Sequence, residues 1–321
     1  MNLIDMHCDT LWKLLDGDPD WDLDNNQCSV SVEYLKKAQS CAQFFACFIY
    51  MEDFRGPSRY EQAYEYAHRM LVRLKREVKR YENDLAMAYN YESFRRNREE
   101  GKISAIATIE EGGIVHDEMD RIDELYAAGI RLITLLWNHE NCMGYPNSKD
   151  IGIMNAGLKP FGFDTIDKMN ELGMIIDVSH MSDGGFWDTV RYSKVPVAAS
   201  HSNARAIRNH PRNLSDEMIR ALSEIGGVAG LNFYQWFLGG SKDSRIAEMT
   251  AHVLHMMHVG GEDAVCIGTD FDGFEYEGVM EIPNIGAMEL LANALKKAGV
   301  TERQLDKIWS GNVIRVMREV C

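Results

Sequence analysis

The hydrophobic positions of the chain fall into eight short, mostly continuous runs, separated by longer amphipathic segments. Continuous apolar runs are typical of strands buried on both faces, whereas an apolar position every three or four residues is typical of a helix with one face against a core. The pattern predicts strands at residues 3–9, 41–50, 103–110, 131–137, 173–180, 195–201, 227–234 and 264–271. Among the helices that it predicts are residues 60–81, 118–128, 161–172, 216–225, 244–258, 285–298 and 302–319.

Two of these helices carry N-terminal capping signals. Ser215 stands directly before the helix that begins at Asp216, and Thr301 is followed three residues later by Gln304. A hydroxyl residue at such a position accepts a hydrogen bond from a free N–H group of the first helical turn.

Eight strands that alternate with helices predict an α/β fold, either a (β/α)8 TIM-type barrel or a doubly wound sheet. We favour the barrel, because candidate site residues follow the first, third, fifth, sixth and eighth strands, and a closed ring brings these strand ends together. Residues 52–100 hold one or two charged helices, which we expect as extra helices outside the barrel proper. Without an internal repeat or an evident linker, residues 1–321 are predicted to form a single domain.

Charge and composition narrow the range of partners. The chain has 49 acidic and 34 basic residues, a formal charge of −15, which argues against nucleic acid or an anionic membrane as a partner. A hydrophobic content of 45% is ample for a large buried core. A small neutral or zwitterionic substrate fits this composition better than a polyanion.

Cysteine usage and the first residues bear on location. The seven cysteines are odd in number and form no C-x-x-C pair, which favours reduced thiols in a cytoplasm. A strand is predicted from the third residue, without a basic or apolar leader, and no apolar run approaches the roughly 20 residues of a membrane span. We therefore expect a cytoplasmic protein without signal peptide or anchor.

Residue types that bind metals follow five of the eight predicted strands. In strand order they are His7 and Asp9, Glu110 and Glu111, His180, His201, and Asp270. Barrel and open-sheet enzymes keep their chemistry at the carboxyl ends of their strands. The first hypothesis to test is therefore a catalytic metal centre.

The spacing of the ligand candidates supports that hypothesis only when they are taken together. His7 and Asp9 are two residues apart, so on a strand they share one face and one ion can bind both. Singly, a strand-end histidine such as His180 or His201 is more often a hydrogen-bonded loop residue. Three histidines, an aspartate and a glutamate suit Zn²⁺ better than Ca²⁺ or Mg²⁺. Five ligands exceed one tetrahedral site, which predicts two ions bridged by a carboxylate, about 3.5–4 Å apart.

The last predicted strand ends in two aspartates. Asp270 is either a metal ligand or a general base, and we prefer it to Asp272 because it leaves the strand first. The alternative is a turn before Gly273. Three further histidines recur at every third position of one predicted helix and are interpreted as a partly solvated face: His252, His255 and His258.

These motifs, in their order and spacing, resemble the membrane (renal) dipeptidases, zinc peptidases of the amidohydrolase superfamily. The matching segments are His7-x-Asp9, Ile109-Glu110-Glu111-Gly112, Asp177-Val178-Ser179-His180, Ser200-His201-Ser202, Arg212-Asn213, Asn232-Phe233-Tyr234 and Gly268-Thr269-Asp270-Phe271-Asp272-Gly273. The resemblance extends from residue 4 to about residue 316. It implies a (β/α)8 barrel that binds two zinc ions.

The resemblance also implies roles for individual residues. His7 and Asp9 would bind one zinc ion, His180 and His201 the other, and the glutamate would bridge them. Asp270 would take a proton from a metal-bound hydroxide that attacks a dipeptide, and pass it to the leaving amine. Substrate binding would fall to Arg212, whose planar guanidinium matches a C-terminal carboxylate, with Asn213 beside it and Tyr234 lining the pocket.

The chain departs from the family pattern at three points. Glu110 and Glu111 are tandem where the family has one glutamate; counting back from Gly129 favours Glu110. Trp137 stands where many members have a histidine that polarises the scissile carbonyl, and His139, two residues on, is the candidate substitute. We expect neither the export signal nor the lipid anchor of the animal enzymes in this chain, so the family name is not taken as an indication of location.

The leading prediction is a dizinc dipeptidase. The alternatives are another metal-dependent amide or lactone hydrolase on the same barrel, and a metal-stabilised binding protein without turnover. A free substrate carboxylate bound by Arg212 would favour the dipeptidase over the other hydrolases. The preferred dipeptides, their stereochemistry, the native metal and the oligomeric state, with a homodimer as one option, are left open by the sequence.

Overall fold

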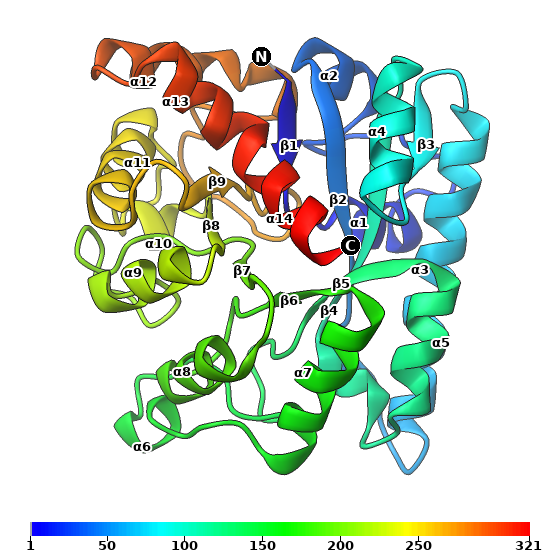
Figure 1. Cartoon of the computed structure of the whole chain (residues 1–321). Coiled ribbons are helices and arrows are strands. Elements are labelled where there is room, and N and C mark those ends of the chain that lie inside the picture. The colour runs from blue at the N-terminus through cyan, green and yellow to red at the C-terminus, as the bar shows by residue number, and fades with distance from the viewer. Residues whose placement is uncertain (1) are drawn as a thin grey trace.

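The computed structural model describes residues 2–321 and contains nine parallel strands in that range. Eight of them close into a ring in the order β1-β2-β4-β5-β6-β7-β8-β9, which confirms the predicted TIM-type barrel (Figure 1). The strands are β1 (Leu3–Asp5), β2 (Ser40–Phe48), β3 (Leu85–Met87), β4 (Ile103–Glu110), β5 (Ile130–Thr134), β6 (Ile175–Asp177), β7 (Ala198–Ala199), β8 (Val228–Leu231) and β9 (Val265–Ile267).

Helices surround the ring and bury their apolar faces against it (Figure 1). They are α1 (Thr10–Asp16), α2 (Val32–Lys37), α3 (Arg59–Arg80), α4 (Tyr91–Glu99), α5 (Asp120–Ala128), α6 (Ile151–Met154), α7 (Pro160–Leu172), α8 (Asp183–Tyr192), α9 (Asp216–Glu224), α10 (Gln235–Leu238), α11 (Ile246–Gly260), α12 (Glu289–Lys297), α13 (Glu302–Asp306) and α14 (Asn312–Val320). Short 3₁₀ turns occupy η1 (Met51–Asp53), η2 (Gly112–Val115) and η3 (Ile285–Ala287), and η4 (Lys307–Gly311) is a π-helical turn. Both predicted caps are present, with Ser215 Oγ accepting from Met218 N and Thr301 Oγ1 from Gln304 N.

Residues 52–100 contain the two charged helices expected there and one strand that was not expected. α3 packs against β2 and β4, so it belongs to the helical layer around the barrel. β3 pairs with Ile103 to Ala105, the first half of β4, while β5 pairs mainly with the second half. β3 and β5 therefore lie on the same edge of β4, and β3 extends the sheet at the amino-terminal end of β4 without entering the ring.

Most strands end earlier than the hydrophobic pattern predicts. β1, predicted to reach residue 9, ends at Asp5, and β9, predicted to reach residue 271, ends at Ile267. Hydrogen bonds still join the segment after β1 to the segment after β9, from Asp270 N to His7 O at 3.1 Å and from Asp9 N to Phe271 O at 2.8 Å. The residues beyond the ladders thus form ordered loops at the carboxyl end of the barrel.

The amino-terminal end of the barrel is closed by the last helix. A cluster of buried apolar residues takes at least one member from each of the eight ring strands, such as Ile4, Phe44 and Cys266. Val313, Val316 and Met317 of α14 pack into the same cluster, and Figure 1 shows α14 lying across the middle of the ring. The open end is therefore the carboxyl end. In residues 2–321 no helix combines the length and the apolar character needed to cross a membrane.

Two glycines let three strands approach closely inside the barrel. A Cβ atom on Gly230 would lie 1.9 Å from the carbonyl oxygen of Ser200, and one on Gly268 would lie 1.7 Å from the same oxygen. No side chain fits at either position, because such distances are far inside van der Waals contact. The segment directly after β7, the strand β8 and the segment directly after β9 approach one another there, next to the backbone of His201.

Candidate metal centre

Six ionisable side chains converge at the carboxyl end of the barrel. They come from the loops after β1, β6, β7 and β9 and from the last residue of β4, and they are His7, Asp9, Glu110, His180, His201 and Asp270. Their nitrogen and oxygen atoms form three overlapping groups, in each of which all ligand atoms lie within 4.8 Å of one another. The structure therefore brings together all five residues predicted as ligands, and Asp270 with them.

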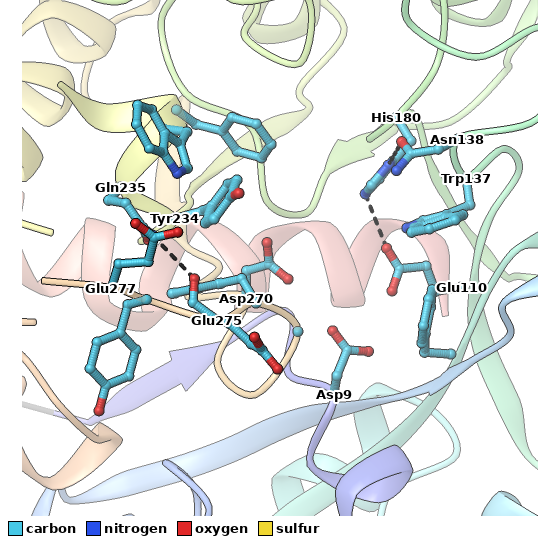
Figure 2. Close-up of a pocket in the computed structure, with 16 residues that line it drawn as sticks. Asp9, Glu110, Trp137, Asn138, His180, Tyr234, Gln235, Asp270, Glu275 and Glu277 are labelled. Atoms are coloured by element: carbon cyan, nitrogen blue, oxygen red, sulfur yellow. Dashed lines mark hydrogen bonds and ion pairs between the residues drawn. The ribbon is translucent and has the colours of Figure 1, made fainter. Parts of the chain in front are cut away.

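Glu110 lies at the centre of the cluster, and its two oxygens face different partners. Oε1 is 3.1 Å from His180 Nε2 and 3.5 Å from His201 Nε2, and Oε2 is 3.2 Å from His7 Nε2. His7 Nε2 is in turn 3.5 Å from Asp9 Oδ2. Figure 2 shows Glu110 facing His180 across the floor of the pocket, with Asp9 below it. A carboxylate placed in this way can bridge two cations.

Two of the three histidines in this cluster, His180 and His201, are in the state that a metal requires, and other donor atoms lack a hydrogen-bond partner among the described residues. Both ring nitrogens of His7 and one oxygen of Asp9 are buried without a hydrogen-bond partner. Burial holds the pKa values of His180 and His201 well below their usual range, so that both imidazoles are neutral with a free lone pair. A bound cation would satisfy atoms that the protein leaves unpaired.

The carboxylates of the cluster also fit a cation. Burial raises the pKa of Glu110 to about 8, with Asp9 and Asp270 adding to the increase against the opposing effect of His7. Gly273 leaves room beside them, since a Cβ there would lie 2.1 Å from Asp9 Oδ2 and 2.5 Å from Asp270 Oδ1. Close, desolvated carboxylates repel one another, and positive ions between them would remove that repulsion.

Hydrogen bonds to the outer ring nitrogens orient two of the histidines. His180 Nδ1 lies 2.9 Å from Asn138 Oδ1, which can only accept, so the lone pair of His180 is on Nε2. His201 Nδ1 lies 2.7 Å from Ser200 Oγ, and that hydroxyl donates to Asp177 Oδ2 at 2.6 Å. Both histidines thus direct Nε2 to Glu110, which is the orientation that outer partners impose on metal ligands.

Asp177 is fully buried and saturated with hydrogen bonds. Its Oδ2 also accepts from Thr134 Oγ1 at 2.6 Å, and its Oδ1 accepts from the backbone N–H groups of Ser179 and Ser200 at 3.0 and 2.8 Å. Asp177 therefore joins the ends of β5, β6 and β7 beneath the site. The sequence motif that contains Asp177 was recognised, but the sequence did not indicate that Asp177 holds these strand ends together.

Asp5 occupies an equivalent position under the other half of the site. Its carboxylate accepts from Thr269 N and Thr269 Oγ1, both at 2.8 Å, from Gln43 Nε2 at 3.0 Å and from His7 N at 3.3 Å. It ties β1 to β2 and β9 without touching an imidazole ring.

The tandem glutamates have different surroundings. Glu111 points away from the cluster: its Oε1 accepts from Gly113 N at 2.8 Å and Asn141 Nδ2 at 2.7 Å, and its Oε2 accepts from Trp137 N at 3.0 Å. The bonds from Trp137 and Asn141 hold the loop after β5, and the bond from Gly113 lies within the loop after β4. Glu110, not Glu111, therefore reaches the centre of the site.

The two aspartates after β9 also differ. Asp270 Oδ2 accepts from Asn232 Nδ2 at 2.8 Å, and Oδ1 lies 3.9 Å from His7 Nε2. Burial raises the pKa of Asp270 to about 6, with Asp9 reinforcing the increase and His7 and Arg212 opposing it. Asp272 is occupied elsewhere, accepting from Thr10 Oγ1 at 2.6 Å and Ser29 N at 2.8 Å. Only Asp270 is available to the cavity.

Left-handed backbone is concentrated around the site. The φ angles of Glu111, His180, Asp270 and Asp272 are 93°, 65°, 62° and 68°. Non-glycine residues adopt this region at a cost, of order 1–3 kcal/mol, that surrounding structure must outweigh. Such strain is common where a fold aims a side chain at a reacting group.

A cavity of about 400 Å³ opens above Asp9, Glu110, His180 and Asp270. Its walls include Tyr234 and Trp137, and Figure 2 shows both rings at its sides, with Tyr234 near Asp270. Its outer part is acidic, with Glu275 and Glu277 among the lining residues. A second cavity, of about 430 Å³, contains Arg212 and shares Asn138, His180 and Phe237 with the first.

Two predicted site residues do not reach either cavity. His139 is not among the lining residues; its ring lies near Tyr50, and its Nε2 is 3.7 Å from Glu52 Oε1. Asn213 is fully buried, and its side-chain N–H groups donate to the carbonyls of Arg208 and Phe237, both at 2.9 Å. A catalytic role for His139 and a direct substrate contact for Asn213 therefore have no geometric support.

For some residues important to the site, the sequence did not indicate the role. Asn138 and Asn232 orient His180 and Asp270, but an asparagine at a strand end is also a common turn residue. The expectation for the histidine-rich helix also needs correction. His252 is fully buried, and its Nδ1 accepts from Ala204 N while its Nε2 faces Leu238 O at 3.1 Å. His255 is partly exposed and His258 is exposed, as expected.

Several known structures share this architecture. A crystal structure of the dipeptidase AC, a metallopeptidase of family M19, superimposes with a TM-score of 0.91 at 25% identity, covering 100% of this chain and 98% of that one. A metallopeptidase from Rhodobacter sphaeroides, bound to a phosphinate mimic of the dipeptide L-Ala-D-Ala, has the same fold, with a TM-score of 0.90 at 22% identity and coverage of 100% and 99%.

Sequence relatives agree with the structural ones. An uncharacterized protein in the pqqA 5′ region of Klebsiella pneumoniae is 37% identical over 235 residues, 70% of this chain and 85% of its own. An uncharacterized dipeptidase of Schizosaccharomyces pombe is 30% identical over 301 residues, 89% of this chain and 70% of its own. The model of the membrane dipeptidase family (peptidase family M19) matches residues 1–321. The chain therefore belongs to the membrane dipeptidase family and is a metal-dependent dipeptidase.

Proposed function

We propose that this protein hydrolyses dipeptides with two zinc ions held around Glu110. The observation that carries the proposal is the position of Glu110, whose Oε1 faces His180 and His201 while its Oε2 faces His7. A single structural zinc would need neither a bridging carboxylate nor an open cavity above its ligands.

The ligand set divides into two halves. His7 and Asp9 would hold one ion, His180 and His201 the other, and Glu110 would contribute one oxygen to each. Neutral imidazole nitrogens together with carboxylate oxygens favour zinc over the hard cations that prefer oxygen alone. Zinc ions bound there would supply Lewis acidity, both to the scissile carbonyl and to the attacking water.

Asp270 is the residue we propose for proton transfer. Asn232 fixes its Oδ2 at 2.8 Å, which leaves Oδ1 facing the cluster near His7. A carboxylate held in this way can take a proton from the attacking water and deliver it to the amine that leaves. Because Asp270 also lies within ligand distance of His7 and His201, metal content and activity must be measured separately in its variants.

Arg212 is the residue we propose for binding the free carboxylate of the dipeptide. Its side chain is buried, and within residues 2–321 its Nε has no hydrogen-bond partner. Its two side-chain hydrogen bonds, to Ser202 Oγ and His201 O, are both long at 3.3 Å. A buried guanidinium with an unused donor provides the bidentate fork that a carboxylate fits. Tyr234, on the wall near Asp270, would limit the space available to the substrate.

Hydrolysis of a dipeptide panel by purified protein tests the proposal directly. Activity should disappear with a chelator and return with added zinc, and amidated dipeptides, which lack the free carboxylate, should be cleaved poorly. Equal cleavage of amides or lactones without a free carboxylate would favour the broader hydrolase alternative. Zinc binding without turnover of any dipeptide would instead favour a binding protein.

A further inference from the structure

The two cavities that meet at His180 have opposite charge. Five carboxylate residues line the metal cavity: Asp9, Glu110, Asp270, Glu275 and Glu277. The neighbouring cavity, around Arg212, is lined by no acidic residue among those that the structure describes, but by Lys149, His210 and Arg212 with polar residues such as Asn147 and Ser148. In Figure 2, Glu275 and Glu277 lie on the side of the metal cavity away from Asn138 and His180, which are shared with the basic cavity.

The basic cavity contains more positive charge than one carboxylate requires. Within residues 2–321, neither Arg212 nor Lys149 has a carboxylate in ion-pairing distance. Arg212 is buried and its Nε has no hydrogen-bond partner in that range, whereas Lys149 is exposed. Arg205, by contrast, is neutralised by Asp183 through two contacts of 2.7 and 2.8 Å. Lys149 and Arg212 thus line one cavity as two cations without a carboxylate in ion-pairing distance among the described residues.

His210 shows that the field in this cavity is positive and adds a neutral donor. Burial lowers the pKa of His210 to about 4, and Arg212, Arg208 and Lys149 lower it further. The imidazole is therefore neutral at pH 7. Its Nδ1 accepts from Arg212 N at 3.2 Å, which places the ring proton on Nε2, and that N–H has no acceptor within residues 2–321.

We propose that this basic cavity binds the acidic side chain of a C-terminal aspartate or glutamate residue, and so makes the protein selective for dipeptides with two carboxylates at that end. The inference rests on the proposed function, in which Arg212 takes the main-chain carboxylate. Lys149 and the free N–H of His210 then remain for the side-chain carboxylate. Each carboxylate of the substrate then has a positively charged partner.

A matched pair of substrates tests this selectivity. The specificity constant, kcat/KM, is measured for alanyl-aspartate and for the isosteric alanyl-asparagine, each with the C-terminal residue in the L and in the D configuration. In at least one configuration, wild-type protein should prefer aspartate by about tenfold, the effect of one charge-assisted contact at a partly exposed site.

Variants of Lys149 identify the source of the preference. Lys149→Met should bring the aspartate-to-asparagine ratio to within about twofold of one, and Lys149→Glu should bring it below one, because the new carboxylate repels the substrate. The control is Lys297→Met, an exposed lysine on α12 that lines neither cavity and should leave the ratio unchanged. Circular dichroism verifies that each variant is folded.

The outcomes separate this inference from the proposed function. If zinc-loaded protein cleaves neither dipeptide nor any other, the proposed function fails and the inference fails with it. If it cleaves both dipeptides with equal specificity constants in both configurations, only the inference is overturned. A preference for aspartate that survives both Lys149 variants would also overturn the role given to Lys149.

Discussion

Asp177→Asn tests whether a buried carboxylate controls the metal site from beneath it. In the native protein Ser200 Oγ donates to Asp177 and must therefore accept from His201 Nδ1, which leaves the lone pair of His201 on Nε2. The asparagine would present an NH₂ group to Ser200 in place of Oδ2. The Ser200 hydroxyl would then turn toward His201, and the imidazole would shift its proton to Nε2, the nitrogen that faces Glu110.

The expected loss of stability in Asp177→Asn follows from the hydrogen bonds that the Asp177 carboxylate accepts. Two hydroxyl donors, Thr134 and Ser200, bind Asp177 Oδ2 at 2.6 Å, and both bonds are lost. Hydrogen bonds to a charged group contribute about 1.5–3 kcal/mol each, and relief of the buried charge returns part of this, so we expect a loss of about 3 kcal/mol in unfolding free energy. Zinc affinity should fall by about 10- to 100-fold, which is the usual effect of removing a hydrogen-bond partner that orients a metal-binding histidine.

Two measurements separate the effects. Urea unfolding of the metal-free protein gives the stability, and competition with a chromogenic chelator gives the zinc affinity. Asp5→Asn is the matched control, because Asp5 is equally buried and accepts four hydrogen bonds but none that leads to an imidazole. It should lose stability to a similar extent and lose less zinc affinity. If Asp177→Asn loses stability but binds zinc as tightly as wild type, the proposed control of the His201 tautomer is wrong.

Four further predictions concern the site itself. Elemental analysis of active protein should give two zinc ions per chain, and one or none would remove the bridged arrangement. Glu110→Gln should lose zinc and activity. Glu111→Gln, whose carboxylate binds the loops after β4 and β5 and no residue of the cluster, should keep both and lose about 1–3 kcal/mol of unfolding free energy in urea titrations. Asp270→Asn should retain zinc while kcat falls by about 10²–10⁴, and zinc loss in proportion to activity would make Asp270 a ligand. Arg212→Lys should raise KM for dipeptides, since lysine lacks the bidentate fork, with zinc content unchanged; an unaltered KM would contradict the carboxylate contact.

The barrel could be predicted because every ring strand has an apolar run that is visible without tertiary information. β3 could not, because Leu85–Met87 is a three-residue strand between charged helices, and only its pairing with β4 makes it a strand. The predicted strands were too long at their carboxyl ends for a related reason. Apolar residues such as Val178 and Phe271 continue past the ladder because the loops that carry the site are themselves buried.

The five ligand candidates could be predicted because each follows a strand, and parallel strands of one barrel end at one place. The choice between Glu110 and Glu111 could not be made in this way, since it depends on donors from the loop after β5 that bind Glu111. His139 shows the same limit. Its loop is held at Trp137 by Glu111, and beyond that point spacing along the chain does not indicate where a side chain points.

The contact of Ser200 with two glycines, Gly230 in β8 and Gly268 directly after β9, has a consequence for directed evolution. A Cβ at either glycine would lie under 2 Å from Ser200 O, the carbonyl next to the metal-ligand candidate His201. Any side chain added at these two positions therefore has to move the backbone that carries His201. Variants with a new substrate range are expected to arise from the residues that line the cavity, and both glycines should stay unchanged in active variants.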